Sequence, residues 1–155
     1  MKRPLRREDR RLDDAAAMAL LERGEYGILS TSDEHNQPYG IPVNYVVLED
    51  QIFFHCATEG QKLENITANR GVSFCVVGRT ELIPEKFSTR YESVVVSGNA
   101  DLVEDAALKN KALEALVAKY APDHLASGKA YIEKLRAKTA VVRISIDHLA
   151  GKARS

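Results

Sequence analysis

Apolar and polar residues alternate along much of the chain, and this two-residue period predicts β-strands. The predicted strands are residues 26–31, 39–48, 51–56, 72–77, 93–103 and 139–146. In the second strand Ile41, Val43 and Tyr45 share one face, so Asn44 points to the opposite face. Gly98 interrupts the fifth strand and predicts a bulge or a sharp bend there. Because most of these strands follow one another with short polar turns between them, they predict an antiparallel sheet.

Helical spacing and capping signals occur between some of the strands. Asp13 or Asp14 can cap a helix that Gly24 ends. Asp105 begins a longer helix that stops before Pro122. Further helices are predicted from about Glu59 and over residues 127–138. The chain is therefore predicted to be mainly β with α, a six-stranded antiparallel β-barrel with peripheral helices, since strands and helices do not alternate regularly enough for a doubly wound parallel sheet.

Composition and charge describe one globular domain. The chain has 155 residues, of which 45% are apolar and 28% are charged, and its net charge is zero. No overall field therefore draws it to nucleic acid or to an acidic membrane. Residues 1–12 are rich in Lys and Arg, but Glu8 and Asp9 interrupt them, which favours a partly ordered, solvated tail over a nucleic-acid arm. We expect the domain to span residues 13–149, with residues 150–155 as a C-terminal tail.

The sequence also predicts where the protein is located and whether it binds a metal. No apolar run approaches the length of a membrane span, and the N-terminus lacks the apolar segment of a secretion signal, so we expect a cytoplasmic protein. Cys56 and Cys75 lie in apolar strands without CxxC spacing and without a nearby cluster of His or Cys. They are predicted to be free thiols, and no metal site is expected.

A candidate anion site follows the third predicted strand. Thr58 and Gln61 match a capping box, and the amides at the start of a helix attract anions such as phosphate. Gly60 lets an anion approach the backbone closely, and Lys62 adds a full positive charge. The plainer interpretation, a capped helix followed by a solvated lysine, stays open on these residues alone.

A second candidate site lies on the neighbouring strands. Pro42 removes one backbone donor and places its strand near an edge, which leaves backbone groups beside Asn44 and Tyr45 that suit a planar heterocycle such as the flavin ring. His55 ends an apolar strand three residues before Thr58. It is either a satisfied structural histidine or a contact for a bound ligand, and Asn44 is either a ligand contact or a solvated side chain.

Three stretches together resemble the pyridoxamine-phosphate-oxidase-like flavoproteins of split β-barrel fold, and within them the branch of the 5-nitroimidazole resistance proteins. The stretches are GIPVNYV, FFHCATEGQKLENI and RYESVVVSGNADLVED. The resemblance covers residues 13–147. It implies a homodimer that holds FMN at the interface between its subunits, so that both subunits build each pocket.

The resemblance also implies roles for individual residues. The isoalloxazine ring would lie against the second strand, the ribityl chain over the end of the third strand, and the phosphate at the helix start. A serine of the other subunit would reach the ring. In this order the residues are Val43, Asn44 and Tyr45; His55 and Cys56; Lys62 with Thr58, Gly60 and Gln61; and Ser93.

Departures from the family pattern bear on the activity. Members that oxidise pyridoxamine phosphate carry a basic residue before the phosphate lysine and a C-terminal Trp, whereas this chain has Gln61 and no Trp. The leading hypothesis is an FMN-dependent oxidoreductase that acts on a small, flat molecule such as a nitroaromatic. In it His55 contacts the substrate or tunes the flavin, and the polar residues 79–90 form a loop that can act as a lid.

Two other hypotheses stay open. A module that binds flavin or haem without turnover needs only the pocket, and the sequence shows no paired acid and base. A dimer that has lost its cofactor is the third, and Gln61 is the only hint of it.

Overall fold

The computed structural model describes residues 3–155 as eight strands and four α-helices. The strands are β1 (Gly27–Ser32), β2 (Pro38–Val43), β3 (Val46–Leu48), β4 (Gln51–Ala57), β5 (Gly71–Ile83), β6 (Ser88–Leu102), β7 (Thr139–Ile144) and β8 (His148–Arg154). The α-helices are α1 (Asp14–Arg23), α2 (Gln61–Ala68), α3 (Ala106–Tyr120) and α4 (Leu125–Leu135). Met1 and Lys2, part of the predicted basic tail, lie outside the described residues.

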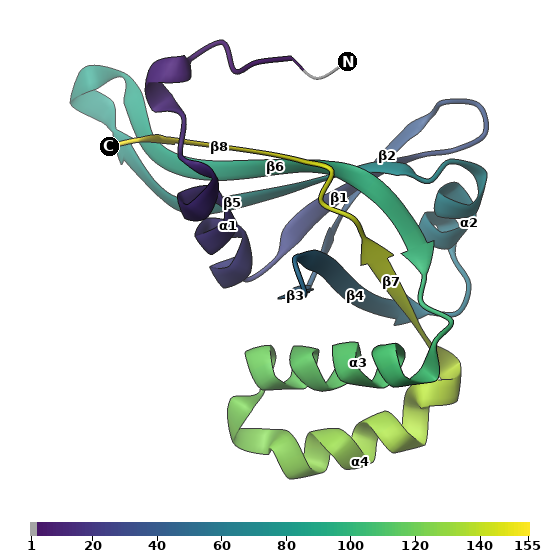
Figure 1. Ribbon diagram of the computed structural model, residues 1–155. Helices are drawn as coiled ribbons and strands as arrows, with labels where there is room; N and C mark the ends of the chain where they lie inside the picture. Colours follow the sequence, from purple (N-terminus) through teal and green to yellow (C-terminus); the bar gives the residue numbers. More distant parts are fainter. Residues whose placement is uncertain (1–2) are drawn as a thin grey trace.

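All the strand pairs are antiparallel, in the order β2-β1-β5-β6-β7-β4-β3, with β8 added against β6. The fold is a split β-barrel with peripheral helices, as predicted, although it has eight strands rather than six (Figure 1). One half contains β1, β2, β5 and β8, and the other half contains β3, β4 and β7. The long strand β6 belongs to both halves.

Gly98 lies where β6 passes from one half to the other. Up to Ser97 the strand pairs with β8, and from Ala100 it pairs with β7. A Cβ atom at Gly98 would lie 1.7 Å from the backbone oxygen of Ser145, so only glycine fits this crossing. Figure 1 shows β6 curving there, which agrees with the bend predicted from the sequence.

Residues 39–48 do not form the single strand that the alternation predicted. β2 pairs with β1 and ends at Val43, whereas β3 begins at Val46 and pairs with β4. The chain therefore changes from one half of the barrel to the other at Asn44 and Tyr45. Contacts with α3, whose residues are far away in the sequence, fix this break.

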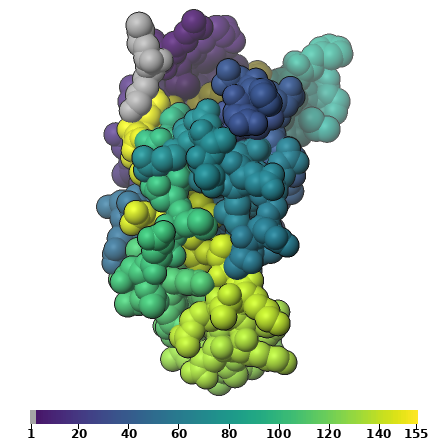
Figure 2. Space-filling model, turned by 90° about the vertical axis from the view of Figure 1, so that its right-hand side faces the viewer, coloured from purple at the N-terminus to yellow at the C-terminus, as the bar shows by residue number. Residues whose placement is uncertain are grey.

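Residues 79–90 also differ from the prediction, because they form paired strands and a tight turn rather than a loop. β5 and β6 continue past a bulge between Val77 and Thr80 and stay in register to Ile83 and Ser88. A short 3-10 helix, Pro84–Lys86, closes this hairpin, which projects from the barrel (Figures 1 and 2). The loop predicted over residues 79–90 is therefore a β-hairpin.

The residues predicted to form a C-terminal tail belong instead to β8, which runs to Arg154 and pairs with β6 from Tyr91 to Ser97. The end of the N-terminal segment lies beside β8, where the amide of Leu12 donates to the carbonyl of Gly151 at 2.9 Å. The ordered part of the chain therefore extends beyond both ends of the expected domain.

Two apolar cores share the barrel wall. Phe54 on β4 points into the barrel, where it packs with Leu20 and Leu21 of α1. Its neighbour Phe53 points outward and packs against the α3–α4 pair, with Leu116 among its contacts. Asp13 and Asp105 cap α1 and α3 by accepting from the amides three residues on, as predicted.

Candidate functional site

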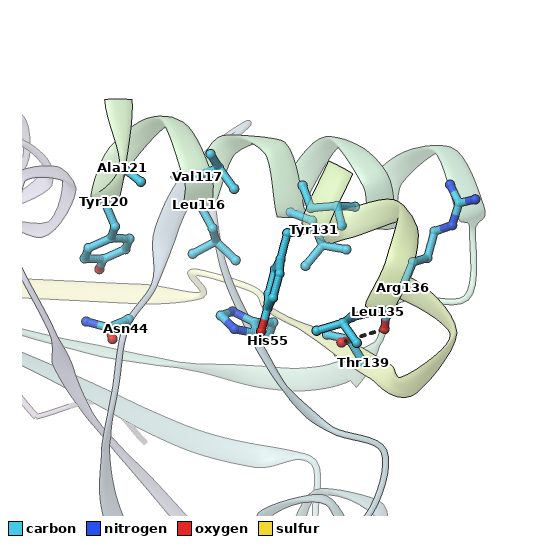
Figure 3. A pocket seen from close by; sticks show the side chains of 12 residues that line it. Asn44, His55, Leu116, Val117, Tyr120, Ala121, Tyr131, Leu135, Arg136 and Thr139 are labelled. Carbon is cyan, nitrogen blue, oxygen red and sulfur yellow. Dashed lines mark hydrogen bonds between the residues drawn. The ribbon is translucent and has the colours of Figure 1, made fainter. Parts of the chain in front are cut away.

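A cavity of about 260 Å³ lies between the α3–α4 pair and the barrel wall (Figure 3). Most of its lining is apolar and comes from the two helices. The barrel contributes a few polar side chains from the β2–β3 break, from β4 and from β7. The lining residues are Asn44, His55, Leu113, Leu116, Val117, Tyr120, Ala121, Tyr131, Ile132, Leu135, Arg136 and Thr139.

His55 reaches this cavity because it alternates with Phe53 on the outward face of β4. Burial lowers the pKa of His55, so its imidazole is neutral at neutral pH. A neutral imidazole offers one N–H donor and one nitrogen acceptor. This position is compatible with a contact to a bound ligand, which stays a prediction.

Asn44 also faces the cavity, on the side opposite to the core as the alternation predicted. One of its side-chain N–H groups donates to the carbonyl of Glu25 at 3.1 Å. This contact leaves the amide oxygen and a second N–H for other partners. The structure therefore brings Asn44 and His55 together at one cavity, although Asn44 lies in the β2–β3 break and His55 lies on β4.

Tyr45 has a different environment from the one expected of a ring contact. Its side chain is fully buried in the barrel core, where its hydroxyl donates to the carbonyl of Leu21 and its ring meets Phe74 edge-on. Burial raises the pKa of that hydroxyl. Val43 is half-buried against the same core. Neither side chain lines the cavity, and their role as contacts of a bound ring stays a prediction.

The backbone of Tyr45 is also occupied, by two consecutive residues of α3. The Tyr120 hydroxyl accepts from the amide of Tyr45 at 2.9 Å and lies 2.8 Å from its carbonyl oxygen. Lys119 donates to the same carbonyl at 2.9 Å, and its ammonium lies 3.9 Å from the centre of the Tyr45 ring. Burial lowers the pKa of Lys119 to about 8. This network holds the β2–β3 break in place, and it occupies the amide and carbonyl of Tyr45, two of the backbone groups that the sequence left for a heterocycle.

Lys62 lies at the start of α2, beyond the end of β4. The helix begins at Gln61 rather than at Glu59, with Gly60 at the N-cap and a positive φ of 142°. No side chain caps it, so the predicted capping role of Thr58 is wrong, since the chain turns at Gly60 instead. The first amides of the helix are thus left without a side-chain acceptor.

The charge of Lys62 is not neutralised by any carboxylate among residues 3–155. The half-buried lysine lies close enough to Cys56 to oppose the rise that burial causes in the pKa of its thiol. The C-terminal end of β4 therefore brings together Lys62, Cys56, Gly60 and Gln61. His55, which faces the cavity, directly precedes Cys56 on this strand.

Ser93 lies elsewhere in the same chain. It belongs to β6, where it pairs with Val77 on one side and Lys152 on the other. It is not among the residues that line the cavity. A role at the site would therefore need a second subunit, as the resemblance implied.

The part of the chain that the structure describes has no cluster of three or more His, Cys, Asp or Glu side chains able to hold a metal ion. None of its helices is both long enough and apolar enough to span a membrane.

Comparison with known proteins gives the family. A family model described as pyridoxamine 5'-phosphate oxidase matches residues 13–153. The chain belongs to the pyridoxamine 5'-phosphate oxidase family. Residues 13–153 include every site residue discussed above, so the family assignment covers the cavity and the Lys62 region alike. A search among curated proteins found no significant match.

Solved structures show that the fold of this oxidase family member is shared with distant proteins. A candidate 5-nitroimidazole antibiotic resistance protein from Bacteroides thetaiotaomicron has 21% identity and a TM-score of 0.77, over 92% of this chain and 86% of that one. A conserved hypothetical protein from Mycobacterium tuberculosis has 19% identity and a TM-score of 0.83, over 97% and 90%. An FAD and heme binding protein from Mycobacterium smegmatis has 19% identity and a TM-score of 0.79, over 92% and 72%.

Sequence reasoning missed the helical half of the cavity in this family member. The sequence predicted the helix that begins at Asp105, but it did not show that Ala112 and Leu116 pack against the barrel wall. It gave no role to Tyr120 or Tyr131. Only the packing of α3 and α4 against β4 and β7 shows that both tyrosines line a ligand-sized space.

Proposed function

We propose that the chain is a flavin-dependent oxidoreductase that uses FMN and reduces small, flat molecules such as nitroaromatics. The observation that carries the proposal is the uncompensated cation of Lys62 beside the open backbone of Gly60, next to the strand that presents His55. The family assignment supports it, as do the flavin and nitroimidazole proteins that share the fold.

The residues at the end of β4 fit a phosphate group. A Cβ atom built on Gly60 would meet no atom within 4 Å, so an anion can approach the backbone there. The free amides at the start of α2 and the ammonium of Lys62 offer the donors and the positive charge that phosphate needs. Gln61 stands where many family members carry a second cation, so we expect moderate rather than very tight binding.

The bound flavin would supply the electron transfer, and the protein would supply binding, orientation and exclusion of water. Asn44 has an amide oxygen and an N–H still able to bond to a polar ring edge or to a substrate. His55 has a neutral imidazole that can donate or accept a hydrogen bond there. Tyr45 would act indirectly, because its bonds to α3 fix the position of Asn44.

We also propose a homodimer, supported by an apolar patch on the outer face of the barrel. Ile28, Cys75 and Val95 lie side by side on β1, β5 and β6, and Ile28 and Val95 are 38% and 43% exposed. Val77, which is 57% exposed, extends the patch and pairs with Ser93. A second copy packed on this face would carry Ser93 toward the partner's site.

Light scattering on the purified protein tests this arrangement. Val95→Asp is expected to yield a monomer, because it places a charge in the apolar patch, and Ser93→Arg is expected to lower flavin occupancy. A monomeric unmodified protein, or a flavin-loaded dimer of the Ser93→Arg variant, would contradict the proposed interface.

The absorption spectrum after reconstitution with FMN, together with steady-state assays, tests the function itself. We expect flavin bands that stay with the protein through gel filtration, and consumption of a reduced nicotinamide only when a nitroaromatic is present. Absence of bound flavin after reconstitution would overturn the proposal.

A second candidate is a module that binds flavin or haem without turnover. The half-exposed, neutral His55 beside an apolar cavity could serve as an axial ligand, and one protein of shared fold binds both FAD and heme. A Soret band in the protein after addition of haem, lost in His55→Ala, together with no nicotinamide consumption, would favour this candidate.

A further inference from the structure

The cavity beneath α3 and α4 is chemically unlike the phosphate-binding end of the site. Its walls are mostly hydrocarbon, and its lining contains no Asp or Glu. Leu116 and Ile132 form a buried floor, 4% and 7% exposed. Polar groups are confined to the barrel side and to the mouth. Such a space fits a flat, apolar ligand that carries a few polar atoms at one edge.

Tyr131 stands at the mouth of this cavity. Its side chain is 65% exposed, although it projects from α4 into a lining that is otherwise apolar. Figure 3 shows the ring with its hydroxyl directed away from the helices, toward the barrel side where His55 lies. Among residues 3–155 no group bonds to this hydroxyl, in contrast to that of Tyr120. A free hydroxyl at the edge of an apolar cavity can donate to an oxygen of a bound molecule.

The lining of the cavity contains no acidic side chain, and its one permanently charged side chain is that of Arg136 at the rim. Burial lowers the pKa of His55 and so favours its neutral imidazole. A cationic ligand would lose its water without gaining a carboxylate partner, which is costly. An anionic ligand would meet only Arg136, whose guanidinium points away from the cavity in Figure 3. The cavity therefore favours an uncharged ring.

We propose that this cavity is the acceptor subsite of the enzyme, and that Tyr131 selects uncharged aromatic molecules with an acceptor oxygen, such as a nitro or carbonyl group. The ring of the ligand lies between the Tyr131 side chain and the floor of Leu116 and Ile132. The oxygen accepts from the Tyr131 hydroxyl, with His55 and Asn44 as its neighbours. The inference rests on the flavin-dependent function proposed above, and it adds the charge class of the substrate and the residue that recognises it.

Binding of a matched set of probes tests the charge class without any turnover. The probes are 4-nitrobenzyl alcohol, 4-nitrobenzoate and 4-nitrobenzylamine at pH 7, which share the ring and differ in charge. Isothermal titration of the protein, with and without FMN, is expected to give the tightest dissociation constant for the alcohol and at least tenfold weaker binding of the amine. Equal or tighter binding of the amine would overturn the charge argument.

Two pairs of variants test the location. Tyr131→Phe is expected to weaken binding of the alcohol by about two- to tenfold, the usual contribution of one hydrogen bond, whereas Tyr26→Phe, at another exposed tyrosine, leaves it unchanged. Ala121→Phe fills the cavity and is expected to abolish binding, whereas Ala118→Phe, exposed on the same helix, does not. Unchanged binding in both Tyr131→Phe and Ala121→Phe would overturn the subsite.

The same measurements separate this inference from the proposed function. Flavin that stays bound while the alcohol ignores Tyr131 and Ala121 would refute the subsite and leave the flavin function standing. Probe binding that depends on these residues in a protein that never takes up flavin would support the subsite and refute the flavin function.

Discussion

The Lys62 region and the cavity beneath α3–α4 lie near the same end of β4, yet they are built differently. The first presents an unpaired cation and free amides on an open turn, so it contributes little to folding and offers much to a ligand. The second is enclosed by side chains that also form the outer core around Phe53, so its shape depends on the packing of the fold. Substitution of Lys62 should therefore lower ligand affinity alone, whereas substitution of the residues that form the outer core should lower stability.

Removing the ring at Phe53 is expected to have the largest effect. Phe53 is fully buried between β4 and α3, and Phe53→Ala should lower the free energy of unfolding by about 3–5 kcal/mol. Urea denaturation followed by circular dichroism measures this change. Phe87→Ala is the matched control, because Phe87 is 98% exposed at the tip of the β5–β6 hairpin and should change stability by less than about 0.5 kcal/mol. Similar losses in both variants would contradict the assignment of the outer core.

Lys62→Ala addresses the other region and should act on the ligand alone. Loss of a charge-assisted contact with phosphate is worth about 1.5–3 kcal/mol, so the dissociation constant for FMN should rise by about ten- to a hundredfold. Flavin fluorescence titration measures it. The midpoint of urea unfolding of the flavin-free protein should stay the same, since no described carboxylate pairs with this lysine. A shifted midpoint with unchanged FMN affinity would reverse the contrast between the regions.

Tyr120→Phe sharpens the comparison within the helical pair. The Tyr120 hydroxyl accepts from the amide of Tyr45 at 2.9 Å and donates its one proton to the carbonyl of Glu25 at 2.6 Å. Its removal leaves these groups short of partners and should cost about 1–3 kcal/mol of unfolding free energy. Tyr131→Phe removes a hydroxyl without a described partner and should leave stability unchanged. The difference between the two unfolding curves decides whether α3 holds the β2–β3 break.

The smallest effect is a pH dependence from Lys119. Burial lowers its pKa from the ordinary 10.5 to about 8 in the folded protein. Between about pH 8 and 10.5 the unfolded chain binds the proton and the folded chain does not, so this group makes the protein more stable as the pH rises through that window. In Lys119→Met the contribution disappears. Unfolding of both proteins at pH 7.5 and pH 10 should show a smaller rise with pH for the variant, and equal slopes would refute the buried amine.

Local signals in the sequence were enough for many of the elements. Asp13 and Asp105 marked the starts of α1 and α3, because a cap bonds to an amide only three residues on. Gly98 marked the bend of β6 by its lack of a side chain, although the oxygen that excludes a Cβ atom there belongs to the distant Ser145. The alternation also placed His55 on the outward face of β4 and Asn44 opposite to the core. For the caps and the side-chain directions the determining interactions lie within a few residues.

The elements that the sequence did not predict depend on distant partners. The break at Tyr45 needs Tyr120, 75 residues away, and nothing in the strand itself signals it. The hairpin over residues 79–90 is solvated on both faces, so its polar composition resembles that of a loop. Gly60, and not Thr58, begins α2, because a glycine with positive φ replaces the side-chain cap. The cavity could not be predicted either. Its polar residues have a pattern typical of solvent-exposed positions, and its apolar walls come from helices that are remote from β4 in the sequence.

The shared strand β6 has a consequence for how the molecule unfolds. It pairs with β5 and β8 along one stretch and with β7 along the stretch that directly follows. Neither half of the barrel can therefore melt without exposing an edge of the other. Because β6 is common to both halves, heating is expected to unfold them together in one cooperative transition.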